Sequence, residues 1–165
     1  MFAGSQGGHY KELMGLKSLF ARYDSVLVTD NLSAINQHDI VSLFKAVELS
    51  HAKADNRVKR AGKISENPSR WNETSSYLKM FIECFRIYRK HYPAIVVSTG
   101  SYIAVPLFIM AKLYGAKTVF IESNAMVYNK TTTGRLVEKL SDKIYVQWPE
   151  MLKVYPQAEY CGVIH

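Results

Sequence analysis

Residues 94–123 read AIVVSTGSYIAVPLFIMAKLYGAKTVFIES, and this stretch predicts one complete strand–helix–strand unit. Its two ends, Ala94–Ser98 and Lys117–Glu122, are continuous apolar runs rich in Val and Ile, which is typical of strands buried on both faces of a parallel sheet. The helix expected between them, Ser101–Tyr114, is hydrophobic nearly all round, so it is either deeply buried or partly inserted into a membrane. Parallel strands joined by helices build open α/β sheets.

The same alternation continues on both sides of this unit. We expect further strands at Ser25–Thr29 and Lys143–Gln147, and helices at Gly8–Ala21, about Asn72–His91 and Thr132–Leu140. The pattern predicts an α/β fold, a Rossmann-like open parallel sheet with helices on both faces.

Two segments depart from the alternation. A first strand is expected before Gly4, but only Met1–Ala3 precede it, so we expect that strand to be truncated. Residues 31–71 are polar and basic, and we expect an irregular or partly helical insertion there, either an exposed loop or a ligand loop. The 165 residues suffice for one domain, and we assign residues 1–165 to it.

Composition narrows the function classes. The apolar share of 48% argues against a disordered chain. The formal net charge of +7 attracts anions in general, so it favours no one class among nucleic acid, anionic lipid and diphosphate. No run approaches the ~18–20 apolar residues of a spanning helix, and the N-terminus lacks the pattern of a signal peptide. We therefore expect a peripheral protein without a transmembrane helix.

Neither the cysteines nor the long basic helix identifies a site. Cys84 and Cys161 lie far apart and outside any CxxC or Cys/His cluster, so we expect reduced core thiols and no metal. The helix near Asn72–His91 carries five apolar residues at helical spacing: Leu78, Phe81, Ile82, Phe85 and Tyr88. It packs on the core with a solvated basic face, or it lies on a membrane surface.

A glycine-rich turn, GSQGGH at Gly4–His9, separates the expected first strand from the first helix. Such a turn lets backbone N–H groups approach an anion, and the helix N-terminus adds its dipole. The spacing is not GxGxxG, so dinucleotide binding is not indicated. A tight strand–helix turn would explain the glycines without a ligand, but it would not explain His9. That histidine could act as a general base or contact a diphosphate.

Two more polar turns follow predicted strands. STGSY, residues 98–102, places Ser101 and other hydroxyls beside a helix start, where capping is the simplest role. IESNA, residues 121–125, places Glu122, Ser123 and Asn124 after a third strand. Open α/β sheets bind ligands outside the carboxyl ends of their strands, so the three turns are expected to converge on a polar, phosphate-bearing ligand.

Taken together, these residues resemble a known family. The opening SQGGHYKEL is similar to the SxGGHxxEL start of bacterial capsule and exopolysaccharide glycosyltransferase subunits of the PssD/CpsF type. Residues 96–123 and 133–162 resemble the same subunits, with IES, TGRL and VQWPE in order. Their eukaryotic counterpart is the membrane-anchoring subunit of the two-component enzyme that adds the second GlcNAc to dolichyl-diphosphate-GlcNAc. The MurG N-terminal domain is a more distant likeness, and residues 31–71 match poorly.

The resemblance implies the acceptor-side, N-terminal half of a GT-B glycosyltransferase. A partner subunit would bind the UDP-sugar, and the acceptor would be a polyprenyl-diphosphate-linked sugar at the cytoplasmic membrane surface, with no nucleic acid and no metal. His9 and Glu122 are the expected catalytic residues of an inverting hexosyl transfer, in which one or the other would deprotonate the acceptor hydroxyl. The residues expected at the acceptor and its diphosphate are Ser5, Gly7, Gly8, Gly100, Ser101, Ser123 and Asn124.

Two other functions stay open at this point. The chain could be a non-catalytic membrane adaptor that recruits and activates its catalytic partner. It could instead be an unrelated nucleotide-binding Rossmann protein, which would bind a UDP-sugar or NAD by itself.

Overall fold

The computed structural model describes residues 1–5, 7–30, 45–49 and 70–164. Its described strands form one sheet of seven in the order β3-β2-β1-β4-β5-β6-β7, and all neighbouring pairs are parallel. The strands are β1 (Phe2–Ala3), β2 (Val26–Thr29), β3 (Lys45–Glu48), β4 (Ile95–Ser98), β5 (Lys117–Ile121), β6 (Lys143–Val146) and β7 (Glu159–Tyr160). The sheet grows first toward β3 and then from β4 toward β7, which confirms the Rossmann-like class.

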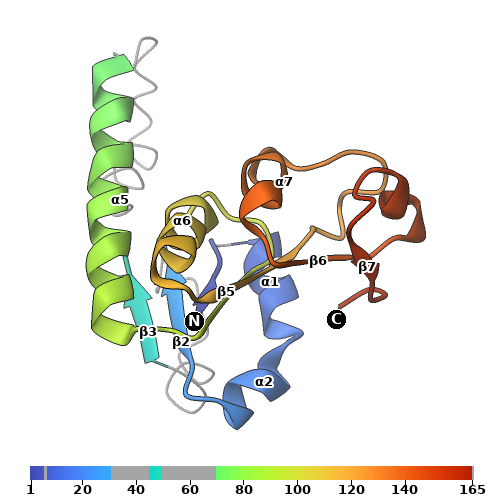
Figure 1. Cartoon of the computed structure of the whole chain (residues 1–165), viewed down its shortest axis with the longest axis horizontal. Helices are drawn as coiled ribbons and strands as arrows, with labels where there is room; N and C mark the ends of the chain where they lie inside the picture. The colour runs from blue at the N-terminus through green and yellow to red at the C-terminus, as the bar shows by residue number, and fades with distance from the viewer. Residues whose placement is uncertain (6, 31–44, 50–69, 165) are drawn as a thin grey trace.

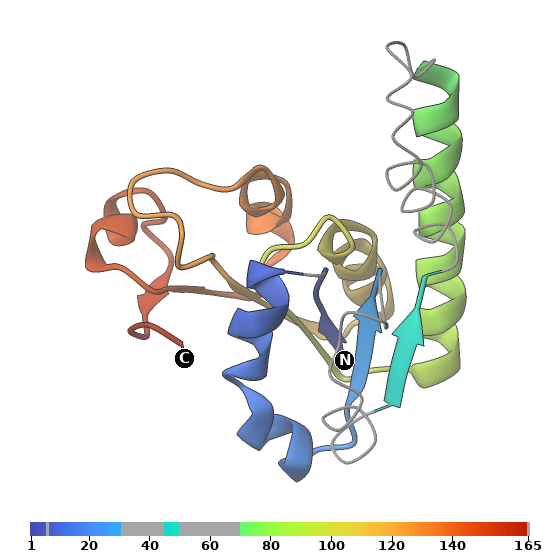
Figure 2. The same ribbon diagram turned by 180° about the vertical axis from the view of Figure 1, so that it is seen from behind.

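Helices cover both faces of this sheet. They are α1 (Gly8–Met14), α2 (Lys17–Arg22), α5 (Arg70–His91), α6 (Ala104–Tyr114) and α7 (Thr132–Val137), with 3₁₀ turns η2 (Glu138–Leu140) and η3 (Pro149–Lys153). Figures 1 and 2 show α1 and α2 on one side of the sheet and α5, α6 and α7 on the other.

The alternation of side chains along the central strands creates these two layers. Successive residues of a strand point to opposite faces. Phe2 of β1 and Leu27 of β2 pack with Leu13 and Phe20 of the first two helices, and the rings of Phe2 and Phe20 meet edge to face with centroids 4.2 Å apart. Ala3, next along β1, belongs to the larger core under the other helices.

The apolar helix α6 lies deep in this larger core, which answers the open choice between burial and membrane insertion. It packs between α5 and α7, and Pro106, Leu107 and Phe108 are buried. In the described part of the chain, no helix combines the length and the apolar character needed to span a membrane.

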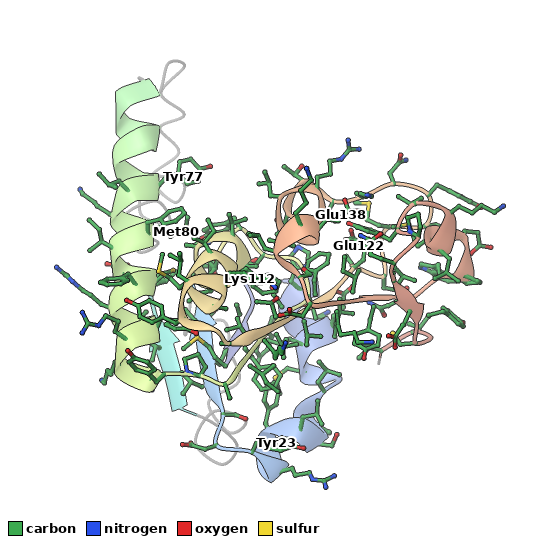
Figure 3. All side chains as sticks on the ribbon, viewed as in Figure 1. Tyr23, Tyr77, Met80, Lys112, Glu122 and Glu138 are labelled. Atoms are coloured by element: carbon green, nitrogen blue, oxygen red, sulfur yellow. The ribbon has the colours of Figure 1, made fainter. Side chains whose placement is uncertain are left out.

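The long helix α5 buries a narrower stripe than its sequence predicted. Met80, Cys84 and Tyr88, spaced four apart, enter the core, and Figure 3 shows Met80 on the side of α5 that faces α6. Leu78 and Ile82 were expected in the apolar face, but they are 63% and 43% exposed. The correction follows from geometry, since one neighbouring helix covers only a narrow strip of α5.

The N-terminal half contains two strands, β1 and β3, that are difficult to predict from the sequence. β1 has only two residues, yet it pairs with both β2 and β4 at the centre of the sheet. β3 lies within residues 31–71, where we expected loop and short helix, so that part of the prediction missed a strand. The remainder of that segment lies outside the described residues.

Helix ends and one cysteine also differ from expectation. The helix predicted over Gly8–Ala21 is two helices, interrupted at Gly15 and Leu16, because glycine is a poor helix former. Cys84 is a buried free thiol, and burial raises its pKa to about 12. Cys161 is also free but exposed, not a core thiol, because it follows the edge strand β7.

Candidate functional site

Three polar turns lie along one edge of the sheet, at the carboxyl ends of β1, β4 and β5. They comprise residues 7–9, 98–102 and 121–125, and we call this edge the rim. The first turn contacts the second through His9 and Thr99. The helix α1, which continues from the first turn, contacts the third turn through hydrogen bonds to Ser123 and Asn124. The convergence expected from the sequence is therefore present, at the place where α/β sheets bind ligands.

The ring of His9 is held in a fixed orientation against the β4–α6 turn. Its Nδ1 lies 2.9 Å from the carbonyl oxygen of Thr99. A carbonyl only accepts, so Nδ1 carries the hydrogen and the neutral ring keeps its lone pair on Nε2. Thr99 Oγ1 donates in return to the His9 carbonyl at 2.8 Å. The His9 side chain stays 31% exposed.

Gly100 makes the close approach of this ring possible. Its φ of +107° lies in the region that favours glycine. A Cβ at this position would also lie 3.1 Å from Cε1 of His9. Gly100 therefore shapes the His9 site through its backbone, and it is buried.

The hydroxyls of the second turn are used within the protein. Ser98 Oγ donates to the Ala3 carbonyl at 2.9 Å. Ser101 is 2% exposed, and its Oγ accepts a 3.4 Å hydrogen bond from the Ile103 N–H. These bonds fit the simple interpretation of this turn, in which the hydroxyls satisfy backbone groups before a helix.

Glu122 occupies a different environment from His9. It is 1% exposed and lies beside α7 in Figure 3. Its Oε1 accepts from the Ser123 N–H at 3.0 Å. Its Oε2 accepts from the Thr131 N–H at 3.2 Å and the Tyr155 hydroxyl at 2.6 Å. Both oxygens therefore hold the β5–α7 loop in place, and the carboxylate is buried.

Two residues distant in sequence complete this buried carboxylate site. Tyr155 is fully buried, and burial together with the Glu122 carboxylate raises the pKa of its phenol, so it remains a donor. Gly134 leaves the space that the cluster occupies: a Cβ there would lie 2.5 Å from Glu122 Oε2 and even closer to the Tyr155 hydroxyl. This crowding explains why the TGRL segment has a glycine at this position, where no larger side chain fits.

The remaining predicted residues differ in how accessible they are. Gly7 and Gly8 are exposed at the start of α1, and Ser5 is half-buried. Ser123 is 8% exposed, and its hydroxyl donates to a carboxylate of α1 at 3.0 Å. Asn124 is half-buried, and its side-chain Oδ1 has no hydrogen-bond partner among the described residues.

Sequence reasoning missed Glu12 as a site residue. Its Oε1 accepts from Ser123 Oγ at 3.0 Å and from the Asn124 N–H at 2.8 Å. Its Oε2 lies 4.0 Å from His9 Nδ1. The available signal was the spacing, since residues three apart lie on the same face of a helix.

The rim offers a partly exposed imidazole, exposed glycines at a helix start and a hydrogen-bonded loop. These groups can take a proton from a hydroxyl and bind an anion. No three His, Cys, Asp or Glu side chains of the described ranges lie close enough to hold a metal ion.

Comparison with known proteins adds solved structures and sequence relatives. MurG of Acinetobacter baumannii superimposes with a TM-score of 0.64 and 13% identity, over 91% of this chain and 41% of MurG. UDP-GlcNAc 2-epimerase of Methanocaldococcus jannaschii gives a TM-score of 0.59 and 10% identity, over 98% of this chain and 45% of the epimerase. These likenesses concern the fold, and the chain spans less than half of either structure.

Sequence relatives are matched over more of their own length than these structures are. The UDP-N-acetylglucosamine transferase subunit ALG14 of Mus musculus is 27% identical, over 98% of this chain and 80% of its own length. Its counterpart in Yarrowia lipolytica is 25% identical, over 96% and 77%. The model of the family described as "Oligosaccharide biosynthesis protein Alg14 like" matches residues 1–164. The chain therefore belongs to the Alg14-like family of oligosaccharide biosynthesis proteins.

Proposed function

We propose that this chain is the acceptor-side subunit of a two-component glycosyltransferase. In this proposal it binds a polyprenyl-diphosphate-linked sugar at the cytoplasmic membrane surface, and a partner subunit supplies the UDP-sugar. Two of its relatives are named as subunits of a UDP-N-acetylglucosamine transferase. The chain's fold covers 41% of MurG, which fits one half of a larger enzyme.

The relatives also suggest which substrates to test first. A Prochlorococcus marinus protein, 43% identical over 41% of this chain and 18% of its own length, is named as a transferase of N-acetylglucosamine to a pyrophosphoryl-undecaprenol acceptor. UDP-GlcNAc is therefore the first donor to test. The resemblance to capsule and exopolysaccharide subunits makes lipid-linked precursors of those polymers the first acceptors.

His9 is the proposed general base, and its contact with Thr99 is the observation that carries this assignment. Because Nδ1 donates to the Thr99 carbonyl, Nε2 is the nitrogen free to accept a proton. In an inverting transfer, Nε2 would take the proton of the acceptor hydroxyl. The hydroxyl oxygen would bond to the anomeric carbon of the donor sugar, and UDP would leave with the electron pair of the broken bond.

The other predicted residues receive more limited roles. The exposed backbone of Gly7 and Gly8 at the start of α1 is proposed to face the acceptor diphosphate, with Ser5 and Asn124 at its margin. Gly100, Ser101 and Ser123 are proposed to act by shaping the rim. For Glu122, the alternative base, burial and three hydrogen bonds favour a role in holding the loop.

Replacement of the proposed base tests this function. Co-expression with the UDP-sugar-binding subunit, purification of the complex and a transfer assay on lipid-diphosphate acceptors would give turnover for wild type and His9→Gln. A positioned base contributes roughly 10²–10⁴-fold, so His9→Gln is expected to reduce turnover by that factor while the complex still assembles. His91→Gln, at the far end of α5, is the matched control with unchanged turnover.

The non-catalytic adaptor stays the second candidate, because most polar residues of the rim bond within the protein. Under that alternative, the His9→Gln complex assembles and turns over like wild type. That result would remove His9 from the chemistry and assign the catalytic groups to the partner.

A further inference from the structure

The carboxylate of Glu12 joins the first and third turns of the rim. One oxygen, Oε1, accepts two hydrogen bonds from the β5 loop, from Ser123 Oγ at 3.0 Å and from the Asn124 N–H at 2.8 Å. The other oxygen, Oε2, lies 4.0 Å from Nδ1 of His9. One side chain therefore contacts both the loop and the proposed base.

The second oxygen of this carboxylate is unusual. Oε2 is buried and has no hydrogen-bond partner among the described residues, and the Glu12 side chain is 12% exposed. Buried polar atoms normally have a partner, so an exception calls for an explanation. Among the described residues no donor bonds to this oxygen. The His9 ring, when protonated, is a cationic group 4.0 Å away.

We infer that Glu12 is a positioning residue for the proposed transfer and acts through His9. When Nε2 takes the proton of the acceptor hydroxyl, the ring becomes positive, and the Glu12 carboxylate stabilises that charge from the Nδ1 side. Through Oε1 the same carboxylate holds Ser123 and Asn124 against α1. The inference rests on the proposed function, because it assigns Glu12 to the base of that reaction.

Two substitutions at this position separate the charge from the hydrogen bonds. Glu12→Gln keeps an oxygen that can accept from Ser123 and Asn124, but it removes the negative charge. Glu12→Ala removes both. We expect Glu12→Gln to lower kcat by about 10- to 100-fold, as part of the larger contribution of the base, with KM within about 3-fold of wild type. Glu159→Gln removes a carboxylate from the edge strand β7 and is the matched control with unchanged kcat.

Hydrogen exchange of the Asn124 amide, measured by NMR on the whole chain, reports only whether Glu12 still holds the β5–α7 loop. We expect wild-type protection in Glu12→Gln and faster exchange in Glu12→Ala. If Glu12 only held the loop, Glu12→Gln would keep wild-type kcat together with wild-type protection, and that pair of results would overturn the inference.

A double-mutant cycle tests whether Glu12 acts through His9. If it does, adding Glu12→Gln to a His9→Gln complex should change kcat by less than about 3-fold, because the charge has lost the group it stabilises. A full additional loss would overturn the inference. Wild-type turnover by His9→Gln alone would remove the proposed base and this inference with it, whereas impaired His9→Gln beside normal Glu12→Gln would remove the inference only.

Discussion

The His9 turn and the Glu122 loop occupy equivalent places, since each follows a parallel strand at the same edge of the sheet, yet their environments are opposite. The His9 side chain is 31% exposed, and Nδ1 is its bonded nitrogen. Glu122 is 1% exposed and is bonded through both oxygens. A position at a strand end brings a residue to the rim, but burial and bonding separate a group that can react from one that holds the rim together.

The largest effect on stability is expected at Gly134, where the side chains around Glu122 leave no space for a Cβ. Gly134→Ala would place a methyl group 2.5 Å from Glu122 Oε2, and overpacking of this kind lowers the free energy of unfolding by about 3 kcal/mol. Urea unfolding would measure the change. Gly8→Ala is the control, because a Cβ there meets nothing within 4 Å. If Gly134→Ala were as stable as wild type, the packing around Glu122 would not be tight, and the contrast with the His9 turn would fail.

A smaller effect is expected when the loop loses one hydrogen bond without changing shape. Tyr155→Phe keeps the buried ring and removes the hydroxyl that donates to Glu122 at 2.6 Å. Hydrogen bonds to charged groups contribute about 1.5–3 kcal/mol, so the free energy of unfolding should fall by about 2 kcal/mol. Tyr128→Phe, 71% exposed, should leave it unchanged. Equal stability of the two variants would mean that the Glu122 cluster contributes little.

The smallest effect concerns the carboxylate of Asp142, which lies just before β6 and so at the opposite end of the strands from the rim. Asp142 accepts from Lys112 Nζ at 2.7 Å and from the Thr118 N–H at 2.8 Å. These contacts lower the pKa of Asp142 from 3.8 to about 2. Because the folded pKa is the lower one, the stabilisation is complete above about pH 4 and is lost as pH falls toward 2.

The corresponding variant is Asp142→Asn. It should lose about 1 kcal/mol at pH 7, allowing for solvent screening of a partly exposed pair. Its unfolding free energy should also fall less than that of wild type between pH 4 and pH 2. Urea titrations at these pH values would measure both. A parallel acid dependence in the two proteins would exclude Asp142 as the source of this stabilisation.

Much of the sheet could be predicted because its strands have a strong local signal. Val26–Thr29, Ile95–Ser98, Lys117–Ile121 and Lys143–Val146 all lie within the predicted runs. β3 was missed because its four residues, KAVE, carry no such apolar run and lie in a polar segment. The two residues of β1 are a strand mainly because β2 and β4 lie on either side of them.

The candidate site was harder to predict than the fold. The three turns were found because glycines and polar residues follow strands, and parallel strands end at one edge. The environment of Glu122 could not be found in this way, because it depends on Tyr155, 33 residues later, and on the room left by Gly134. Glu12 follows His9 by three residues in the sequence, but its role became apparent only from its contact with the β5–α7 loop.

The most direct test of the account compares His9→Gln and Glu122→Gln in the assembled complex, with turnover and thermal midpoint measured on the same preparations. His9→Gln should lose roughly 10²–10⁴-fold in turnover with an unchanged midpoint. Glu122→Gln should lower the midpoint and, well below it, keep turnover within about 10-fold of wild type, since it leaves the base intact. The reverse pattern, with normal turnover for His9→Gln and a stable but inactive Glu122→Gln, would contradict the account.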